Sequence, residues 1–168
     1  MSGVTIRDET PADAAAIRAL TEAAFRDAPH GSGAEAAIVD ALRAAGALGL
    51  SLVACENGQI TGHAAFSPVR IGTGEGQWFG LGPISVRADR RRHGIGAALV
   101  REGLSRLRRQ GAAGAVVLGD PAWYGRFGFI SDGALRYGDI PAAYMQRVLL
   151  AGPPPEGEVR YHPAFDAP

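Results

Sequence analysis

The chain has 168 residues, 46% of them hydrophobic and 20% charged, which is ordinary for one globular domain. Its 17 basic residues, all arginines, balance 17 acidic ones, and a net charge of zero argues against a general binder of nucleic acid or membrane surfaces. One cysteine, Cys55, excludes an intrachain disulfide. The early charges exclude a signal peptide and no long apolar run predicts a membrane span, so we expect a cytoplasmic protein.

The first third of the chain predicts one short strand and two helices. An alternating segment, residues 4–7, precedes Thr10 and Pro11, a pair typical of a helix start. Apolar residues then recur at helical spacing as far as Phe25, before a polar, glycine-rich stretch. Residues 35–45 show the same spacing. A polar loop therefore joins the two predicted helices.

A β-hairpin is predicted next, because residues 50–55 and 59–69 flank the Asn57-Gly58 pair. On its second strand, His63 and Ala65 share the face opposite the large apolar side chains. His63 is therefore either a general base or a structural histidine with satisfied hydrogen bonds, and we favour the structural interpretation.

The following strand, residues 78–86, is interrupted by Gly82 and Pro83. Proline cannot donate to a ladder, and glycine within a strand often marks a bulge or the close approach of a ligand. We expect a bulge here, with the backbone N–H groups near Ile84 and Val86 partly unpaired.

A helix over residues 94–110 is predicted, since apolar residues from Ile95 to Leu107 fall on one face and Gly111 can end it. The basic turn before it contains three arginines, residues 90–92, and His93. Free N–H groups of a first helical turn attract anions, and glycine at 94 and 96 permits close contact with the backbone. We therefore expect a phosphate or diphosphate at this turn.

Two common phosphate motifs do not fit this turn. A Walker motif needs a lysine, and a dinucleotide fingerprint needs glycine or alanine where Leu99 stands. A ligand with a diphosphate at one end and an amide-bearing arm at the other would satisfy both the basic turn and the bulged strand. Coenzyme A has this shape.

The remaining chain predicts a buried strand at residues 115–118, a short helical turn from Asp120 to Tyr124, and strands at 127–130 and 145–150. Residues 136–142 are expected to be a loop, and the proline-rich residues 152–168 to extend over the surface. The order of elements predicts an α/β fold, in which helices flank a mixed sheet.

Two motifs carry a family resemblance. Residues 91–96, RRHGIG, match the pattern Q/R-x-x-G-x-G/A of the GNAT superfamily of N-acetyltransferases, and residues 124–129, YGRFGF, resemble its later Y-x-x-x-G-F block. The preceding LGP and the run GDPxxYxRFGF resemble a bacterial subgroup of predicted N-acetyltransferases. The resemblance implies one GNAT domain over residues 1–150, followed by a C-terminal extension, 151–168, packed on it or trailing from it. It also implies a largely antiparallel central sheet, with a bulge and splayed strands at the cofactor site.

The resemblance further implies transfer of an acetyl group from acetyl-CoA to a primary amine, by direct attack in a ternary complex. Tyr124 takes the place of the family's general acid, with packing beside Trp123 as the alternative. His30 and Glu35, in the loop that lines the acceptor site in GNAT enzymes, are candidate substrate contacts, against a purely structural role for each. No metal is expected. The implied cofactor contacts are Ile84, Ser85, Val86, Arg91, Arg92, His93, Gly94, Ile95, Gly96 and Ala97.

The sequence departs from the family in two respects. Many relatives carry a glutamate on the strand before the motif, whereas residues 78–86 contain no acidic side chain and Ser85 is a poor base. A water chain, His63, Glu35 or an amine of low pKa remain alternatives for the base. Many relatives also have an asparagine and a longer helix before the tyrosine, so the clamp on the pantetheine arm is expected to differ here.

Two rival functions remain. A GNAT-fold acyl-CoA sensor with little catalysis is compatible with the absence of a strand glutamate. A nucleic-acid module using residues 90–92 is disfavoured by zero net charge and by the lack of interleaved aromatic residues. We expect an amine acceptor, no nucleic acid or membrane partner, and a monomer or homodimer. The sequence does not identify the acceptor.

Overall fold

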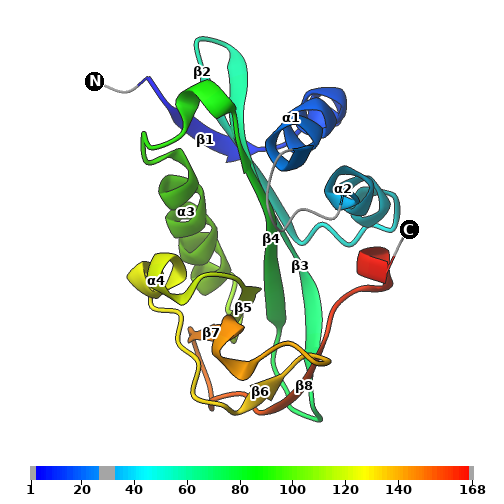
Figure 1. The fold of residues 1–168 in the computed structure, drawn as a ribbon, viewed down its shortest axis with the longest axis vertical. Coiled ribbons are helices and arrows are strands. Elements are labelled where there is room, and N and C mark those ends of the chain that lie inside the picture. Colours follow the sequence, from blue (N-terminus) through cyan, green and yellow to red (C-terminus); the bar gives the residue numbers. More distant parts are fainter. Residues whose placement is uncertain (1–2, 27–32, 167–168) are drawn as a thin grey trace.

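The computed structural model describes residues 3–26 and 33–166. A mixed sheet forms its centre, with α1 and α2 on one face and α3 and α4 on the other (Figure 1). The helices are α1 (Ala14–Arg26), α2 (Glu35–Ala44), α3 (Ile95–Arg109) and α4 (Pro121–Tyr124). The strands are β1 (Thr5–Asp8), β2 (Leu50–Glu56), β3 (Gln59–Ile71), β4 (Trp78–Val86), β5 (Gly114–Leu118), β6 (Leu135–Arg136), β7 (Met145–Leu149) and β8 (Gly157–Arg160).

The sheet has the order β1-β2-β3-β4-β5-β7, and β8 pairs with both β3 and β6. Neighbours along the main path are antiparallel except β4 and β5, which are parallel. α3 makes the crossover between these two strands, as a parallel pair requires. The predicted mixed, largely antiparallel sheet is confirmed.

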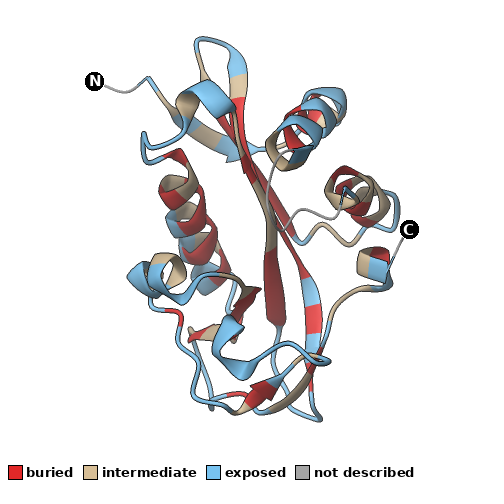
Figure 2. Cartoon of the chain, in the orientation of Figure 1, coloured by how far each residue is buried: buried red, intermediate tan, exposed pale blue. Residues whose placement is uncertain are grey.

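The main core lies between α3 and the sheet. Buried residues line β4 and one side of α3, whereas α4 is exposed or half-buried (Figure 2). Phe66, Leu99 and Leu107 are fully buried there. Gly62 and Gly103 allow α3 to approach closely, because a Cβ on Gly103 would lie 2.3 Å from Cζ of Phe66. The helical face predicted from Ile95 to Leu107 is therefore the face that packs on the sheet.

β4 has the predicted bulge. The pairing of Phe66 with Leu81 and of Ala64 with Ile84 leaves one extra residue on β4, at Gly82-Pro83. β4 pairs with β5 only from Trp78 to Gly80, where Gly80 faces Val116. Beyond this point the two strands are unpaired with each other. We call this unpaired stretch the strand gap.

Three sequence predictions about elements are wrong. Residues 127–130 are not a strand: a 3-10 turn (Gly125–Phe127) ends at Gly128, whose φ is +96°, and only Ile130 forms a bridge, to Arg147. Residues 136–142 are not all loop, because β6 includes Arg136. The strand at residues 145–149 is not the last, because β8 follows within the proline-rich extension.

Candidate functional site

The backbone of β4 presents unpaired groups along the strand gap. The N–H of Arg87 donates to the carbonyl of Thr61 at 2.9 Å, which fixes the direction of the neighbouring groups. Because hydrogen-bonded and non-bonded pairs alternate in an antiparallel ladder, the N–H groups of Ile84 and Val86 point away from β3. They point to the edge where β5 is no longer paired. This is the arrangement expected from Gly82 and Pro83.

The first turn of α3 lies next to this edge. Gly94 is the N-cap with φ +78°, and Ala98 is the first residue whose N–H donates within the helix, to the carbonyl of Gly94. The N–H groups of Ile95, Gly96 and Ala97 therefore have no intrahelical acceptor. A Cβ placed on Gly96 would lie 3.7 Å from Cγ2 of Val86 and 3.6 Å from Cζ2 of Trp123. Gly96 thus faces both β4 and α4.

The arginines before α3 differ in their partners. Arg90 forms a two-point ion pair with Glu56, at 2.7 and 2.9 Å, so its charge is neutralised. Arg91 is exposed and reaches the carbonyl of Ala24 at 3.4 Å. Arg92 is exposed, with φ +64°. Within the described ranges neither Arg91 nor Arg92 is in an ion pair, so these two, with exposed His93, remain available to an anion.

Tyr124 lies at the far side of the strand gap. Its ring packs edge-on against Trp123 at 4.8 Å and Phe129 at 5.8 Å between centroids. A Cβ on Gly119, which follows β5, would lie 2.5 Å from Cε2 of the Tyr124 ring. Burial raises the pKa of Tyr124 to about 12, so the phenol is neutral at ordinary pH. Its hydroxyl has no hydrogen-bond partner in the part of the chain that the structure describes.

Arg126 follows α4 and covers the neighbouring aromatic rings. Its guanidinium carbon lies 5.1 Å from the ring centroid of Trp123 and 5.3 Å from that of Phe127. Arg101 of α3 approaches Phe127 from the other direction, at 5.1 Å. α4 and the first half of α3 are therefore joined by cation–π contacts and carry positive charge. The sequence analysis passed over both arginines and Trp123, although Trp123 and Arg126 lie in or next to the YGRFGF block.

His63 is fully buried on the other face of the sheet, under α1. Its Nε2 lies 2.8 Å from Oγ of Ser51, whose hydroxyl donates to Glu9. Ser51 therefore accepts from Nε2–H, and Nδ1 is left without a partner among the described residues. Burial lowers the pKa of His63 to about 4, so the imidazole is neutral and the 4.0 Å approach to Glu9 is no ion pair. This geometry favours the structural interpretation of His63.

Ser85 faces the same way as His63, because the two residues are paired across β3 and β4. Its Oγ is buried and has no partner within the described ranges. Of the predicted cofactor contacts, Ser85 can therefore offer its backbone to the strand gap but not its hydroxyl.

The predicted acceptor residues lie between α1 and α2. His30 is outside the described residues. Glu35 begins α2, and its Oε1 accepts from the N–H of Gly33 at 3.0 Å. It lines a cavity of about 450 Å3 together with Thr21, Phe25 and Arg26. The structure thus places Glu35 on the α1–α2 side of the sheet, away from α3.

Comparison with known proteins identifies the family. The profile of the acetyltransferase (GNAT) domain matches residues 5–130, about three quarters of the chain. The chain belongs to the GNAT acetyltransferase family. An Escherichia coli protein named as the uncharacterized N-acetyltransferase YhbS is 46% identical over 125 residues, which cover 74% of this chain and 72% of that protein.

Two solved GNAT structures resemble the whole chain. A GNAT family acetyltransferase from Brucella melitensis, in complex with acetyl-CoA, is 51% identical, with a TM-score of 0.87 over 99% of this chain and 100% of that one. Escherichia coli YhbS, in complex with CoA, is 39% identical, with a TM-score of 0.88 over 98% of this chain and 92% of that one. Both likenesses include the C-terminal extension, which the family profile does not reach.

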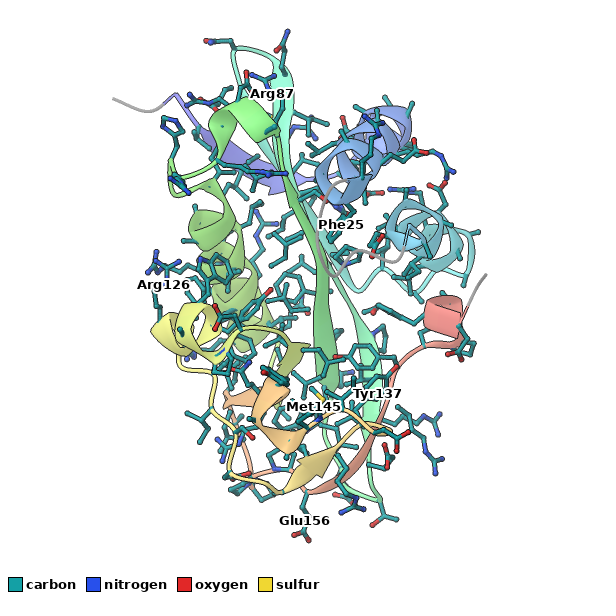
Figure 3. The ribbon with its side chains drawn as sticks, viewed as in Figure 1. Phe25, Arg87, Arg126, Tyr137, Met145 and Glu156 are labelled. Carbon is teal, nitrogen blue, oxygen red and sulfur yellow. The ribbon has the colours of Figure 1, made fainter. Side chains whose placement is uncertain are left out.

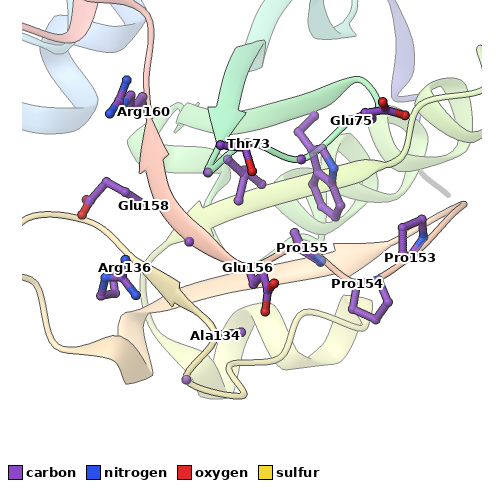
Figure 4. Close-up of a pocket in the computed structure, with 16 residues that line it drawn as sticks. Thr73, Glu75, Ala134, Arg136, Pro153, Pro154, Pro155, Glu156, Glu158 and Arg160 are labelled. Atoms are coloured by element: carbon purple, nitrogen blue, oxygen red, sulfur yellow. The ribbon is translucent and has the colours of Figure 1, made fainter.

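A cavity of about 870 Å3 lies well away from the α3 turn. It is enclosed by β6, β8, the loop after β3 and the prolines 153–155 (Figure 4). Its walls combine carboxylates and arginines with backbone, and none of its residues belongs to the two family motifs. No group of three or more potential metal ligands occurs among the described residues. None of the helices they form is long and apolar enough to cross a membrane.

Proposed function

We propose that this GNAT protein transfers an acetyl group from acetyl-CoA to a primary amine by direct attack in a ternary complex. The observation that carries the proposal is the juxtaposition of two sets of unpaired N–H groups. Those of the α3 turn and those of Ile84 and Val86 meet around Gly96. A diphosphate and an amide-bearing arm, joined in one molecule, suit this pair of sites. The acetyl-CoA and CoA bound to the two similar proteins support the choice.

Each part of the site has a chemical task. The N–H groups of Ile95, Gly96 and Ala97 would hold the diphosphate, with positive charge from Arg91 and Arg92 and a contact from His93 nearby. The φ of +78° at Gly94 suits glycine and sets the turn that exposes these groups. The backbone of residues 84–86 would pair with the pantetheine arm. An N–H group of this strand would also stabilise negative charge on the acetyl oxygen during attack.

Tyr124 is the proposed general acid. Its hydroxyl would protonate the sulfur as the carbon–sulfur bond breaks and the new carbon–nitrogen bond forms. A thiol with a pKa of about 8.5 leaves readily, so this proton contributes about 10²–10⁴-fold at most. Because burial holds the pKa of Tyr124 near 12, the phenol carries its proton throughout the working range.

The amine must lose its own proton, and no carboxylate of β4 is available to take it. His63, with a pKa of about 4 and no exposure, is a weak candidate for this role. Water leading to the α1–α2 side, where Glu35 lies, or an amine of low pKa are the alternatives that the geometry favours. The acceptor is a small molecule or a protein amine.

Replacing Tyr124 with phenylalanine tests the chemical assignment. We expect kcat to fall about 100-fold, while the Kd of acetyl-CoA measured by calorimetry stays within about twofold of wild type, because the ring contacts are retained. Tyr144→Phe, at an exposed tyrosine, is the matched control. Unchanged kcat in Tyr124→Phe would show that Tyr124 only packs.

An acyl-CoA sensor is the second candidate, and the absence of an acidic side chain from β4 favours it. The two functions differ in turnover. Tight binding of acetyl-CoA with no acetylation of any amine in a broad panel would favour the sensor.

A further inference from the structure

Tyr161 lies on the segment that follows β8. β8 pairs with β3 through Ile71 with Val159 and Arg70 with Arg160. Alternation along the strand turns Val159 inward, Arg160 outward and Tyr161 inward again, and Val159 is 1% exposed. The turn Pro163–Asp166 then packs on α2 and holds the segment at both ends. Tyr161 is therefore held against the sheet by fixed elements.

The ring of Tyr161 covers the point at which the strand gap begins. Gly80 is the last residue of β4 that pairs with β5. A Cβ on Gly80 would lie 2.6 Å from Cε2 of Tyr161 and 3.0 Å from Cγ1 of Val69. The space that any other side chain at position 80 would occupy is thus filled by Tyr161.

Tyr161 and Tyr124 approach this point from opposite faces of the sheet. Phe79 and Leu81 face α3, so Gly80, between them, faces the other way. Tyr124 packs with the α3 core, beside Gly119 at the end of β5. Figure 3 shows Arg126, next to α4, on one side of β4 and Tyr137, the ring neighbour of Tyr161, on the other. Each tyrosine lies over a glycine at an end of the gap.

The two hydroxyls are close enough to interact electrostatically. Burial raises the pKa of Tyr161, and the phenols of Tyr137 and Tyr124 raise it further. Tyr161 is consequently neutral at ordinary pH. Its hydroxyl makes no hydrogen bond to any residue that the structure describes, so it can both accept and donate one.

A cavity of about 640 Å3 leads to Tyr161 from the side opposite α3. Its wall includes Tyr137 and Ile140 of the loop after β6, together with residues of β8 and Asp166. A molecule in this cavity meets Tyr161 without crossing the face that carries the α3 turn and Arg91. Two routes therefore converge on the gap, one from each face of the sheet.

We propose that Tyr161 is the acceptor-side tyrosine of the transfer site, where its hydroxyl contacts the attacking amine and orients it toward the acetyl group. The proposal rests on the proposed function, because the gap must hold the thioester. It assigns the amine to the α1–α2 face and the cavity beside Tyr137, and the cofactor to the α3 face. The C-terminal extension thereby completes the site.

Proximity can be tested without knowing the acceptor. We would bind [2-13C]acetyl-CoA to the protein and record NOEs from the labelled methyl group to tyrosine ring protons, with assignment by Tyr161→Phe, Tyr124→Phe and Tyr144→Phe. We expect NOEs to Tyr161 and Tyr124 but not to Tyr144. A wild-type protein that binds acetyl-CoA without an NOE to Tyr161 would overturn this proposal and leave the proposed function intact. Failure of the folded wild type to bind acetyl-CoA would overturn both.

Kinetics then separate contact with the amine from a structural role. With an amine found by screening alkyl monoamines, diamines and glycine-terminated peptides, we expect Tyr161→Phe to raise the KM of the amine about tenfold. The KM of acetyl-CoA and the melting temperature should stay at wild-type values. An equal loss for both substrates, or an unchanged KM for the amine, would contradict the assignment, and Tyr144→Phe is again the control.

Discussion

His63 and Glu9 form the most deeply placed polar group on the α1–α2 face. The side chain of Arg43 donates to both oxygens of Glu9, at 2.8 and 3.0 Å, and Ser51 links Glu9 to His63. Although burial raises the pKa of Glu9, the hydrogen bonds from Arg43 and Ser51 lower it further, so the net shift is downward. Glu9 is therefore ionised and His63 neutral in the folded protein.

This arrangement predicts a pH-dependent stability. Burial lowers the pKa of His63 from 6.5 to about 4, so below pH 6.5 the unfolded chain takes up a proton that the folded chain refuses. The free energy of unfolding should fall by up to about 3 kcal/mol between pH 6.5 and pH 4. Urea titrations at several pH values measure this loss.

The control is His63→Gln, which can still donate to Ser51. We expect its free energy of unfolding to be flatter between pH 6.5 and 4.5, above the range in which Glu9 titrates. An equally steep pH dependence in wild type and His63→Gln would contradict the burial of a neutral His63.

The candidate site could be predicted from the sequence only where the signal is local. Gly94, Gly96 and Arg91 stand together in one motif, and the bulge has its cause in Gly82-Pro83. Nothing local indicates that Tyr161 lies on Gly80, since 81 positions separate them in the chain. Equally, the pairing of Arg90 with Glu56 depends on the tertiary fold.

Among the elements, α3 packs most tightly against the sheet. Gly103, buried in its middle, lies against the ring of Phe66. Gly103→Ala gains about 1 kcal/mol of helix propensity but places its Cβ 2.3 Å from the ring. We expect overpacking to prevail and to lower the free energy of unfolding by about 1–3 kcal/mol in urea titrations.

Ser105→Ala, on the exposed face of the same helix, is the matched control and should be neutral or slightly stabilising. A Gly103→Ala variant as stable as Ser105→Ala would show that α3 can move away from the sheet at no cost.

Periodicity predicted the elements that bury a long apolar face and missed the short ones. α1, α2, α3 and the β2–β3 hairpin have such faces or a clear turn signal. β6 has only two residues and β8 follows three prolines, so both depend on partners distant in the chain. The segment 127–130 has a strand-like composition, but Gly128 at φ +96° turns it away after a 3-10 turn.

In the whole molecule, the C-terminal extension ties the two ends of the fold together. β8 bridges β3 and β6, and Phe165 and Ala164 pack on α2. Val159 is buried among Val69, Ile71 and Leu135. We expect Val159→Ala to lower the free energy of unfolding by about 2 kcal/mol, by lost transfer energy and a residual cavity.

Arg160→Ala, at the next and exposed position, should change stability little. If both variants unfolded at the wild-type urea midpoint, the extension would be a loosely attached tail and not part of the folded unit.

The central claim is that the α3 turn and the open edge of β4 bind acetyl-CoA. The most direct measurement is a calorimetric titration of acetyl-CoA into wild type, Arg91→Ala and Arg108→Ala, the last being an exposed arginine near the other end of α3. We predict micromolar binding to wild type, about tenfold weaker binding to Arg91→Ala because a charge-assisted phosphate contact is lost, and wild-type affinity for Arg108→Ala. Absence of binding to folded wild type at millimolar acetyl-CoA would contradict the account.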